Sequence, residues 1–358
     1  MPEPGHPWRI VQWTTGNVAH EAVRAVAAHP DLTLVGGFAH SPEKDGRDVG
    51  ELCGLDPIGI AATDDVDALL DLQPDCVIYT PLHFDVGEAS RILGTGVNVV
   101  TSAEFLSGRS LGAEDQATIE AAARAGGASI FGSGMNPGYV QLLAAVTAGI
   151  STNIGSIRVS ESVDVSMFAG DGNMDELGWG RPRDDPRHAD DLQRATLVFD
   201  DGLDVLAELM GVDLDERRCV VEFAYALHDL DLPGRPIAAG TVGGIDLRWQ
   251  GVVAGSPVLE LHQRWVMGRD LDPPMPAEHG YVVEVQGEPN LRVKLDIWPH
   301  QDLSSMGPDD FHGIGMAITA LPVVNAIPAV VAAEPGIRTY AQLPVVTSSG
   351  RMVARTTQ

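Results

Sequence analysis

The stretch RIVQWTTGNVAHEAVRAV, residues 9–26, places a short apolar strand, a turn around one glycine and an amphipathic helix in direct succession. Residues 10–13 have the apolar character of a buried strand, and residues 18–29 repeat apolar side chains at helical spacing. Pro30 ends this helix, because proline cannot continue one. A strand, a tight turn and a helix in this order open a doubly wound α/β sheet.

The same alternation of strands and helices continues to residue 133. Further strands are expected at residues 32–38, 58–62, 76–81, 97–101 and 128–133, and helices at 64–71, 85–93 and 111–126. Strands that alternate with helices at this spacing pair in parallel. The sequence therefore predicts a Rossmann-type NAD(P)-binding domain over residues 1–145.

The pattern changes after about residue 150. Half-buried strands are expected at residues 156–166, 218–228, 241–254, 259–267, 281–285 and 291–299, with one long helical stretch at 188–211. This pattern predicts an α+β domain on a mostly antiparallel sheet over residues 146–307. A helical stretch at 309–333 follows, and we expect the segment 308–358 to pack back on the first domain.

The composition excludes several classes of function. Lys and Arg total 23 against 50 Asp and Glu, which gives a formal net charge of −27. Such a surface repels nucleic-acid phosphates and anionic lipids, so neither nucleic acid nor a membrane is an expected partner. Cys53, Cys76 and Cys219 form no CxxC pair, which predicts a reducing compartment without a disulfide framework or a zinc site, and we expect no metal. The amino terminus lacks the basic and apolar regions of a signal peptide, so we expect a cytoplasmic protein.

One apolar stretch is long enough to cross a bilayer. Residues 313–333 contain no charged side chain over 21 residues. Pro322, Asn325 and Pro328 interrupt the stretch. We therefore expect a helix buried inside a large protein rather than a membrane span.

The turn after the first strand has the character of a phosphate cradle. The expected dinucleotide contacts lie in five consecutive residues, Thr14, Thr15, Gly16, Asn17 and Val18. Backbone N–H groups at a helix start, helped by hydroxyl and amide side chains, favour an anionic pyrophosphate. The full fingerprint has three glycines and this turn has one, so an ordinary tight turn from strand to helix would look the same.

The end of the second strand indicates which dinucleotide binds. NAD enzymes usually carry an acid about 20 residues after the glycine turn, where it holds the ribose hydroxyls. Residues 36–41 contain no acid, and His40, Ser41 and Lys44 could instead receive a 2′-phosphate. The sequence favours NADP with NAD possible, and the alternative is a polar loop without a ligand.

Four further residues complete the expected cofactor site. Thr80 and Pro81 end the strand at 76–81, and ligands of open α/β sheets bind at the carboxyl ends of strands. In GSGMNPGY (132–139), small residues let the backbone approach a flat ring, and the Asn136 amide could pair with a carboxamide. Asn325 stands alone in an apolar helix and needs a partner, which could be the cofactor or another core group.

Glu104 is the candidate for chemistry. It stands three residues after the strand NVVT (98–101), at the edge where a dinucleotide would bind. A carboxylate beside a nicotinamide could serve as base, as acid and as counter-ion to a cationic intermediate. The alternative is a carboxylate that stabilises a helix start.

Five segments together resemble one family. VQWTTGNVAHEAVRA, GRDVGELCG, VVTSAEF, GSGMNPGY and VVNAIPAV stand in the order and spacing of the dihydrodipicolinate reductase-like oxidoreductases. Within these, the chain looks most like 2,4-diaminopentanoate dehydrogenase and the related native amine dehydrogenases. The resemblance covers nearly the whole chain and implies NAD(P)H-dependent reductive amination of small ketones or aldehydes with ammonia by a homodimer. It also implies that residues 146–307 bind the substrate and form the dimer.

The resemblance implies that Glu104 is the principal catalytic residue, because the acid after the fifth strand has this role in the amine dehydrogenases. The resemblance implies the walls of the substrate pocket only by position in the family, and core packing explains each of these residues equally well. They are Tyr139, Met167, Phe168, His188 and Thr319. Dihydrodipicolinate reductases carry His-His-x-x-Lys followed by Gly-Thr, whereas the comparable stretch here is SESVDVSMFAGDGN. This departure disfavours a role in lysine biosynthesis.

Two alternative functions remain open from the sequence. One is another NADP-dependent imine or aldehyde reductase of the same superfamily, and the other is a non-catalytic dinucleotide sensor. A semialdehyde dehydrogenase would need a nucleophilic cysteine near the nicotinamide, and neither Cys53 nor Cys76 is well placed. An α-keto acid substrate is disfavoured because no carboxylate-binding Arg stands near these segments.

Overall fold

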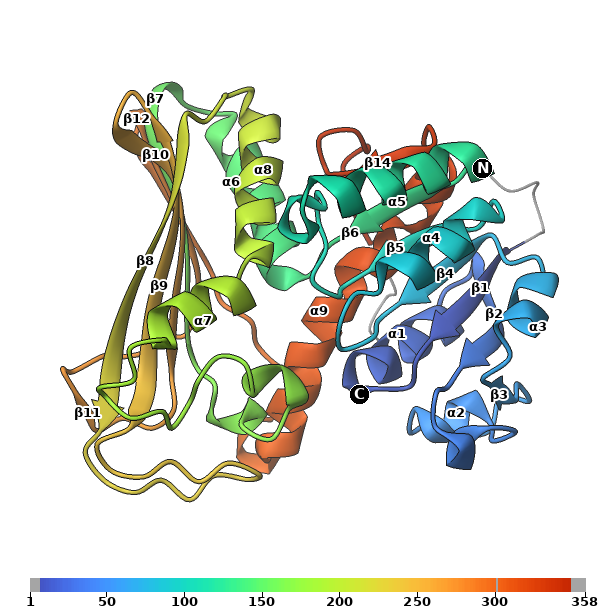
Figure 1. The fold of residues 1–358 in the computed structure, drawn as a ribbon, viewed down its shortest axis with the longest axis horizontal. Coiled ribbons are helices and arrows are strands. Elements are labelled where there is room, and N and C mark those ends of the chain that lie inside the picture. Colours follow the sequence, from blue (N-terminus) through green and yellow to red (C-terminus); the bar gives the residue numbers. More distant parts are fainter. Residues whose placement is uncertain (1–6, 301, 349–358) are drawn as a thin grey trace. The chain divides into compact units, whose positions relative to one another are not determined.

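The computed structural model describes residues 7–300 and 302–348 (Figure 1). The described residues divide into two compact units, of which the first combines residues 7–135 with 315–348 and the second contains 136–300 and 302–314. The chain after residue 315 thus returns to the first unit, as the sequence predicts. The predicted boundary at 145/146 lies inside α6 (Val140–Ala148), which belongs to the second unit.

The first unit is a doubly wound parallel sheet. Its strands follow the order β14-β6-β5-β4-β1-β2-β3, and each neighbouring pair is parallel. The strands are β1 (Trp8–Trp13), β2 (Leu32–Phe38), β3 (Ala62–Thr63), β4 (Cys76–Tyr79), β5 (Asn98–Thr101), β6 (Ser129–Gly132) and β14 (Gly336–Arg338). The helices are α1 (Asn17–Ala27), α2 (Val49–Leu52), α3 (Val66–Asp71), α4 (Val86–Gly94) and α5 (Ala113–Gly126). The predicted Rossmann-type domain is confirmed.

The strand order fixes where a ligand binds. The chain builds outward from β1 through β2 to β3, and then returns to β4 on the other side of β1. The carboxyl ends of β1 and β4 therefore flank the point where the winding reverses, which is the ligand crevice of open α/β sheets. Trp13, the last residue of β1, is fully buried and stacks on Phe38 of β2 with ring centroids 4.5 Å apart. This packing holds the start of the turn after β1 in place.

The segment between β2 and β3 is organised by Asp48 rather than by a longer strand. Its carboxylate accepts backbone N–H groups from both sides of the loop, namely Gly50, Glu51, Ile58, Gly59 and Ile60. The bond from Ile58, with those from three other amides of this group, lowers the pKa of Asp48. Because these N–H groups bind a side chain, they cannot pair with a strand, and the strand predicted at 58–62 shortens to β3.

The second unit is built on a mixed sheet of order β11-β8-β9-β10-β7-β12-β13. Only the β10–β7 pair is parallel, so the predicted mostly antiparallel sheet is confirmed. The strands are β7 (Thr152–Asp164), β8 (Glu216–Ala226), β9 (Val242–Val253), β10 (Ser256–Val266), β11 (Leu271–Asp272), β12 (Gly280–Glu288) and β13 (Leu291–Leu295). Helices α6, α7 (His188–Ala195) and α8 (Val198–Met210) cover one face of this sheet, and no helix of the described residues covers the other face (Figure 1).

The helix predicted over residues 188–211 is two helices. They separate at Thr196, whose hydroxyl donates to the Leu192 carbonyl and accepts the indole N–H of Trp249. A threonine bonded in this way competes with the helical backbone pattern. The apolar period of the sequence continues across the break, which is why the pattern alone predicts one helix.

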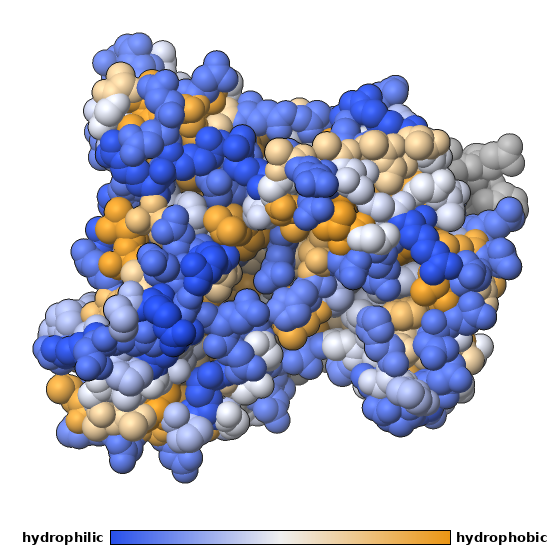
Figure 2. All heavy atoms as spheres, in the orientation of Figure 1, coloured by the Kyte–Doolittle hydropathy of each residue, from blue (hydrophilic) through white to orange (hydrophobic). Residues whose placement is uncertain are grey.

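The apolar segment near the carboxyl end forms α9 (Pro308–Val331). Residues 309–331 are long and apolar enough to cross a bilayer, a test that the core helix of a soluble protein also passes. Its fully buried residues all lie in the part that belongs to the first unit: Ala320, Val323, Val324, Ala326, Ile327 and Val330. On the face of the protein drawn in Figure 2, hydrophilic residues predominate and hydrophobic residues form small patches.

Candidate active site

A pocket of about 480 Å³ opens at the carboxyl ends of β1, β2 and β4, all within the first unit. Eight of the predicted cofactor residues line it: Thr14, Thr15, Gly16, His40, Ser41, Lys44, Thr80 and Pro81. The lining also includes Ala39, Tyr79, Leu82, His83, Asp85 and Glu88, which sequence reasoning missed. Asn17 and Val18 begin α1 directly after Gly16 and are not among the lining residues.

The turn after β1 is held in an unusual conformation. Thr14 has a φ of +78°, a region that residues other than glycine seldom adopt. Its hydroxyl donates to the Thr80 carbonyl at 2.9 Å, and the Gln12 amide donates to the Thr80 hydroxyl at 2.8 Å. These bonds join the turn to the end of β4. Strained residues that surrounding bonds hold in place are concentrated at functional sites, which agrees with a ligand here.

The start of α1 faces the pocket without a side-chain cap. Gly16 precedes the helix and has no side chain with which to cap it. A Cβ at Gly16 would meet no heavy atom within 4 Å, so the space beside the turn is open. An uncapped helix start beside open space fits a pyrophosphate group, whose oxygens would accept these N–H groups.

The loop after β2 brings a cation to this turn. The Lys44 ammonium donates to the Thr15 hydroxyl at 3.0 Å, and both side chains line the pocket. Ser41 precedes the short helix of residues 42–44, and the His40 ring packs edge-on against Phe38 with centroids 4.6 Å apart. The predicted residues of this loop therefore lie together at the carboxyl end of β2, next to the turn after β1.

Glu104 does not lie at a helix start. The chain bends after β5 through residues 102–108, forms a short 3-10 helix at 109–111, and begins α5 only at Ala113. The backbone of Glu104 has a φ of +22°, outside the common region for a residue with a side chain. The helix-start interpretation of Glu104 is therefore wrong.

The residue after Glu104 anchors this loop. Phe105 is fully buried, and its ring stacks on that of Phe84 with centroids 4.9 Å apart and an angle of 15° between the planes. Phe84 belongs to the loop after β4. Two aromatic rings in this arrangement fix the loops after β4 and β5 relative to each other. The side chains beside them are thereby brought together.

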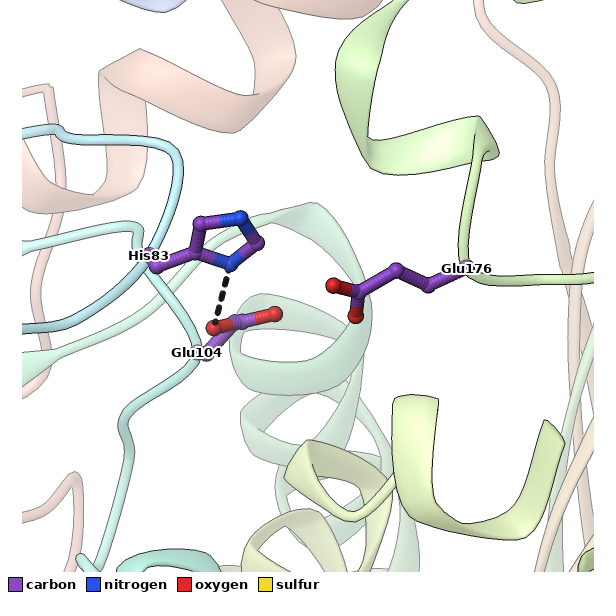
Figure 3. A group of neighbouring side chains, drawn as sticks. All are labelled: His83, Glu104 and Glu176. Atoms are coloured by element: carbon purple, nitrogen blue, oxygen red, sulfur yellow. Dashed lines mark ion pairs between the residues drawn. The ribbon is translucent and has the colours of Figure 1, made fainter. Parts of the chain in front are cut away.

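His83, the residue before Phe84, is brought next to Glu104 by this packing. Its Nδ1 atom lies 3.6 Å from Oε2 of Glu104, and both side chains are about half exposed (Figure 3). His83 also lines the pocket, so it connects the candidate catalytic carboxylate to the predicted cofactor cradle. The position of His83 in the sequence could have indicated it. His83 stands two residues after Pro81, at the carboxyl edge of the sheet, where ligands of open α/β sheets bind. Thr80 and Glu104 were selected on the same ground.

Asn136 is bonded inside the second unit. Its amide donates to the Glu161 carboxylate at 2.7 Å, and its carbonyl accepts from the Gln141 amide at 3.2 Å. Burial raises the pKa of Glu161, against the bonds from Asn136 and the Trp265 indole. Asn325, which belongs to the first unit, is half-buried and has no side-chain hydrogen bond to a described residue. Asn136 is thus tied to Glu161 and Gln141, whereas the Asn325 side chain is available to a ligand.

The five predicted pocket-wall residues belong to different units. Tyr139, Met167, Phe168 and His188 lie in the second unit, and Thr319 lies in α9 within the first. Tyr139 is exposed, whereas His188 is buried with its ring stacked on Phe223 at 4.0 Å between centroids. Burial lowers the pKa of His188, as expected for a neutral histidine in a core. Its packing alone accounts for His188.

The cysteine chemistry of a semialdehyde dehydrogenase does not fit this unit. Cys53 and Cys76 are both buried. Burial raises the pKa of the Cys53 thiol to about 11 and raises that of Cys76 still further. A thiol nucleophile must be ionised to react, so neither side chain is prepared for attack on a carbonyl.

The fold and the pocket define a class of protein: an NAD(P)-dependent oxidoreductase with an amino-terminal Rossmann domain. Two family models agree. Residues 10–101 match the amino-terminal model of dihydrodipicolinate reductase, and residues 139–357 match the carboxyl-terminal domain of 2,4-diaminopentanoate dehydrogenase. The second match spans more than half of the chain. The chain therefore belongs to the 2,4-diaminopentanoate dehydrogenase family of dihydrodipicolinate reductase-like oxidoreductases.

Individual relatives agree over most of the length. An amine dehydrogenase from Streptomyces virginiae is 33% identical over 361 residues, covering 96% of this chain and 98% of that protein. The structure of an amine dehydrogenase from Mycobacterium smegmatis has the same fold, with a TM-score of 0.78, 24% identity and coverage of 96% and 98%. A 4-hydroxy-tetrahydrodipicolinate reductase from Synechococcus elongatus is 34% identical over 82 residues, only 19% of this chain and 30% of that protein. The full-length similarity is to the amine dehydrogenases.

Proposed function

We propose that this protein is an amine dehydrogenase that reductively aminates small ketones or aldehydes with ammonia and NADPH, in a reversible reaction. The observation that carries the proposal is the position of Glu104. Its backbone is strained, its loop is anchored by Phe105, and its carboxylate lies beside a residue that lines the dinucleotide pocket. The similarity to amine dehydrogenases over the whole chain supports the same activity.

Glu104 has three tasks in this reaction. Ammonia is mostly protonated at neutral pH, so the carboxylate first accepts a proton from ammonium. The ammonia that this releases attacks the carbonyl carbon. The same proton then goes to the hydroxyl group of the carbinolamine, which leaves as water and yields an iminium cation. The restored carboxylate finally stabilises that cation. The bound nicotinamide dinucleotide supplies the hydride that converts the iminium into the amine.

The other side chains of the site bind and orient. The start of α1 and the Thr15 hydroxyl hold the pyrophosphate. The Thr14 hydroxyl, which donates to the Thr80 carbonyl, keeps the turn in place. Thr80 and Pro81 border the path toward Glu104, and the Asn325 amide is available to a carboxamide group. No step requires a thiol, which agrees with the buried cysteines.

The activity test is direct. We expect the purified protein to oxidise NADPH only when ammonium and a small ketone or aldehyde are both present. Oxidation with the carbonyl compound alone would instead support an aldehyde reductase, and a preformed imine reduced without ammonium dependence would support an imine reductase. Tight NADPH binding without turnover across the panel would support the dinucleotide sensor.

A single substitution tests the preference for NADP(H). Ser41→Asp places a negative charge beside the expected 2′-phosphate, in a loop where Lys44 supplies the cation. A hydrogen bond to a charged group contributes about 1.5–3 kcal/mol, so we expect the KM for NADPH to rise by about tenfold to a hundredfold. The KM for NADH should fall or stay constant, because an acid can hold ribose hydroxyls.

Ser41→Asn is the matched control for this experiment, because it has nearly the same size as Asp without the charge. It should lower the affinity for NADPH much less than Ser41→Asp does. An unchanged ratio of NADPH to NADH efficiency in Ser41→Asp, or tighter binding of NADH than NADPH by the wild-type protein, would refute the assignment of this loop.

We also propose a soluble, cytoplasmic homodimer. Burial of six apolar α9 side chains between Ala320 and Val330 supports a helix packed inside protein rather than in lipid. The sheet face that no described helix covers is available to a second copy. Untagged protein should remain in the supernatant without detergent and have twice the 37.9 kDa mass of the chain in light scattering. Recovery only from detergent-extracted membranes, or a monomeric mass at micromolar concentration, would contradict this proposal.

A further inference from the structure

His83 and Glu104 form a pair that the fold holds together within the first unit. Each is followed directly by a phenylalanine, Phe84 in one loop and Phe105 in the other. The two rings stack at 4.9 Å, and Phe84 also packs edge-on against Tyr79 at 5.6 Å. Because the rings are fixed, the polar side chains beside them face each other at 3.6 Å (Figure 3).

The distance decides the nature of the contact. At 3.6 Å the Nδ1 and Oε2 atoms are too far apart for a good hydrogen bond, but close enough for an ion pair when the imidazole is charged. Histidine side chains gain their charge as the pH falls through the neutral range. An imidazolium at this position would attract the Glu104 carboxylate and oppose its protonation.

We infer that His83 is a positioning residue for Glu104: its imidazolium holds the carboxylate ionised and oriented toward the pocket, and so extends catalysis to lower pH. This inference rests on the proposed function. Other charged groups of the first unit line the same pocket, namely His40 and Lys44 from the loop after β2, and Asp85 and Glu88 near the start of α4. Among these, Glu88 accepts the Tyr79 hydroxyl at 2.7 Å and Lys44 donates to Thr15.

The test compares the pH dependence of kcat/KM for ammonium-dependent NADPH oxidation in three variants. His83→Asn removes the charge. We expect the pH at which kcat/KM falls on the acidic side (the acidic limb) to rise by about half a unit, because ion pairs between half-exposed side chains are weak. His83→Lys restores a cation and should return the limb to the wild-type pH or below it. His228→Asn is the matched control, because His228 is an exposed histidine of the second unit, and its profile should equal that of the wild type.

A second readout separates this effect from damage to the fold or to cofactor binding. The thermal midpoint should match the wild type in both His83 variants, because the side chain is about half exposed. The dissociation constant for NADPH, measured at each pH, separates any change in cofactor binding from the shift of the acidic limb. An acidic limb that stays at the wild-type pH in His83→Asn would overturn the inference, as would a shift that His83→Lys does not reverse. Absence of ammonium-dependent oxidation in the wild-type protein would instead refute the proposed function itself.

Discussion

Glu104→Gln is expected to lower the turnover number for reductive amination by at least about 10³. Glutamine keeps the size and polarity of the side chain but removes the charge and the titratable proton. General acid–base catalysis contributes about 10²–10⁴ in rate, and one electrostatic contact to a transition state contributes about 10²–10³. The two contributions belong to one group and do not simply add, so we take the lower part of the combined range. Steady-state rates with saturating NADPH, ammonium and carbonyl compound measure the loss.

Binding of NADPH and folding should survive this substitution, because phosphates and ribose supply most of the affinity and Glu104 is about half exposed. Glu114→Gln is the matched control, since Glu114 is an exposed residue in the first turn of α5 and should leave turnover unchanged. Glu104→Asp keeps the charge on a shorter side chain and should fall between the two. A folded Glu104→Gln protein that retains a tenth of the wild-type rate, about 1.4 kcal/mol of lost stabilisation, would remove Glu104 from the mechanism.

Local patterns predicted the first unit well, because each of its elements is recorded in a short stretch of sequence. The apolar run at residues 32–38 coincides with β2, and the acid after the strand at 98–101 stands at the expected edge of the sheet. Pairing in parallel then follows from the alternation of strands and helices. The position of Glu104 could be read from the sequence because it depends only on strand order and on where one strand ends.

Contacts between distant residues are what local patterns could not predict. Asn136 is bonded to Glu161, 25 positions away on β7, and no local feature of GSGMNPGY indicates this partner. Asp48 similarly binds N–H groups up to 12 residues away and thereby shortens β3. His83 was missed for another reason, since its approach to Glu104 depends on the stacking of two phenylalanine rings in separate loops. Such contacts are properties of the packed molecule.

Gly132→Ala is expected to destabilise the first unit and impair catalysis together. Gly132 ends β6, where it pairs with Thr101 of β5, and a Cβ at this position would lie 1.8 Å from the carbonyl oxygen of Phe105. The obstacle is backbone, so no side-chain rotation can relieve it. Overpacking a core costs about 1–3 kcal/mol and occasionally more, and we expect about 3 kcal/mol here because the buried Phe105 must move. Any such movement displaces Glu104, the preceding residue.

Gly94→Ala is the matched control for this prediction. Gly94 is the last residue of α4, where a Cβ would meet no heavy atom within 4 Å, and alanine is preferred over glycine in a helix by up to about 1 kcal/mol. Its variant should therefore melt at or slightly above the wild-type temperature and keep its turnover. Gly132→Ala should melt well below it, and its kcat at 25 °C should fall even where circular dichroism shows a folded protein. A Gly132→Ala variant with wild-type stability would show that the Phe105 loop can shift freely. A variant with lowered stability but wild-type kcat would show that the position of Glu104 does not depend on Phe105.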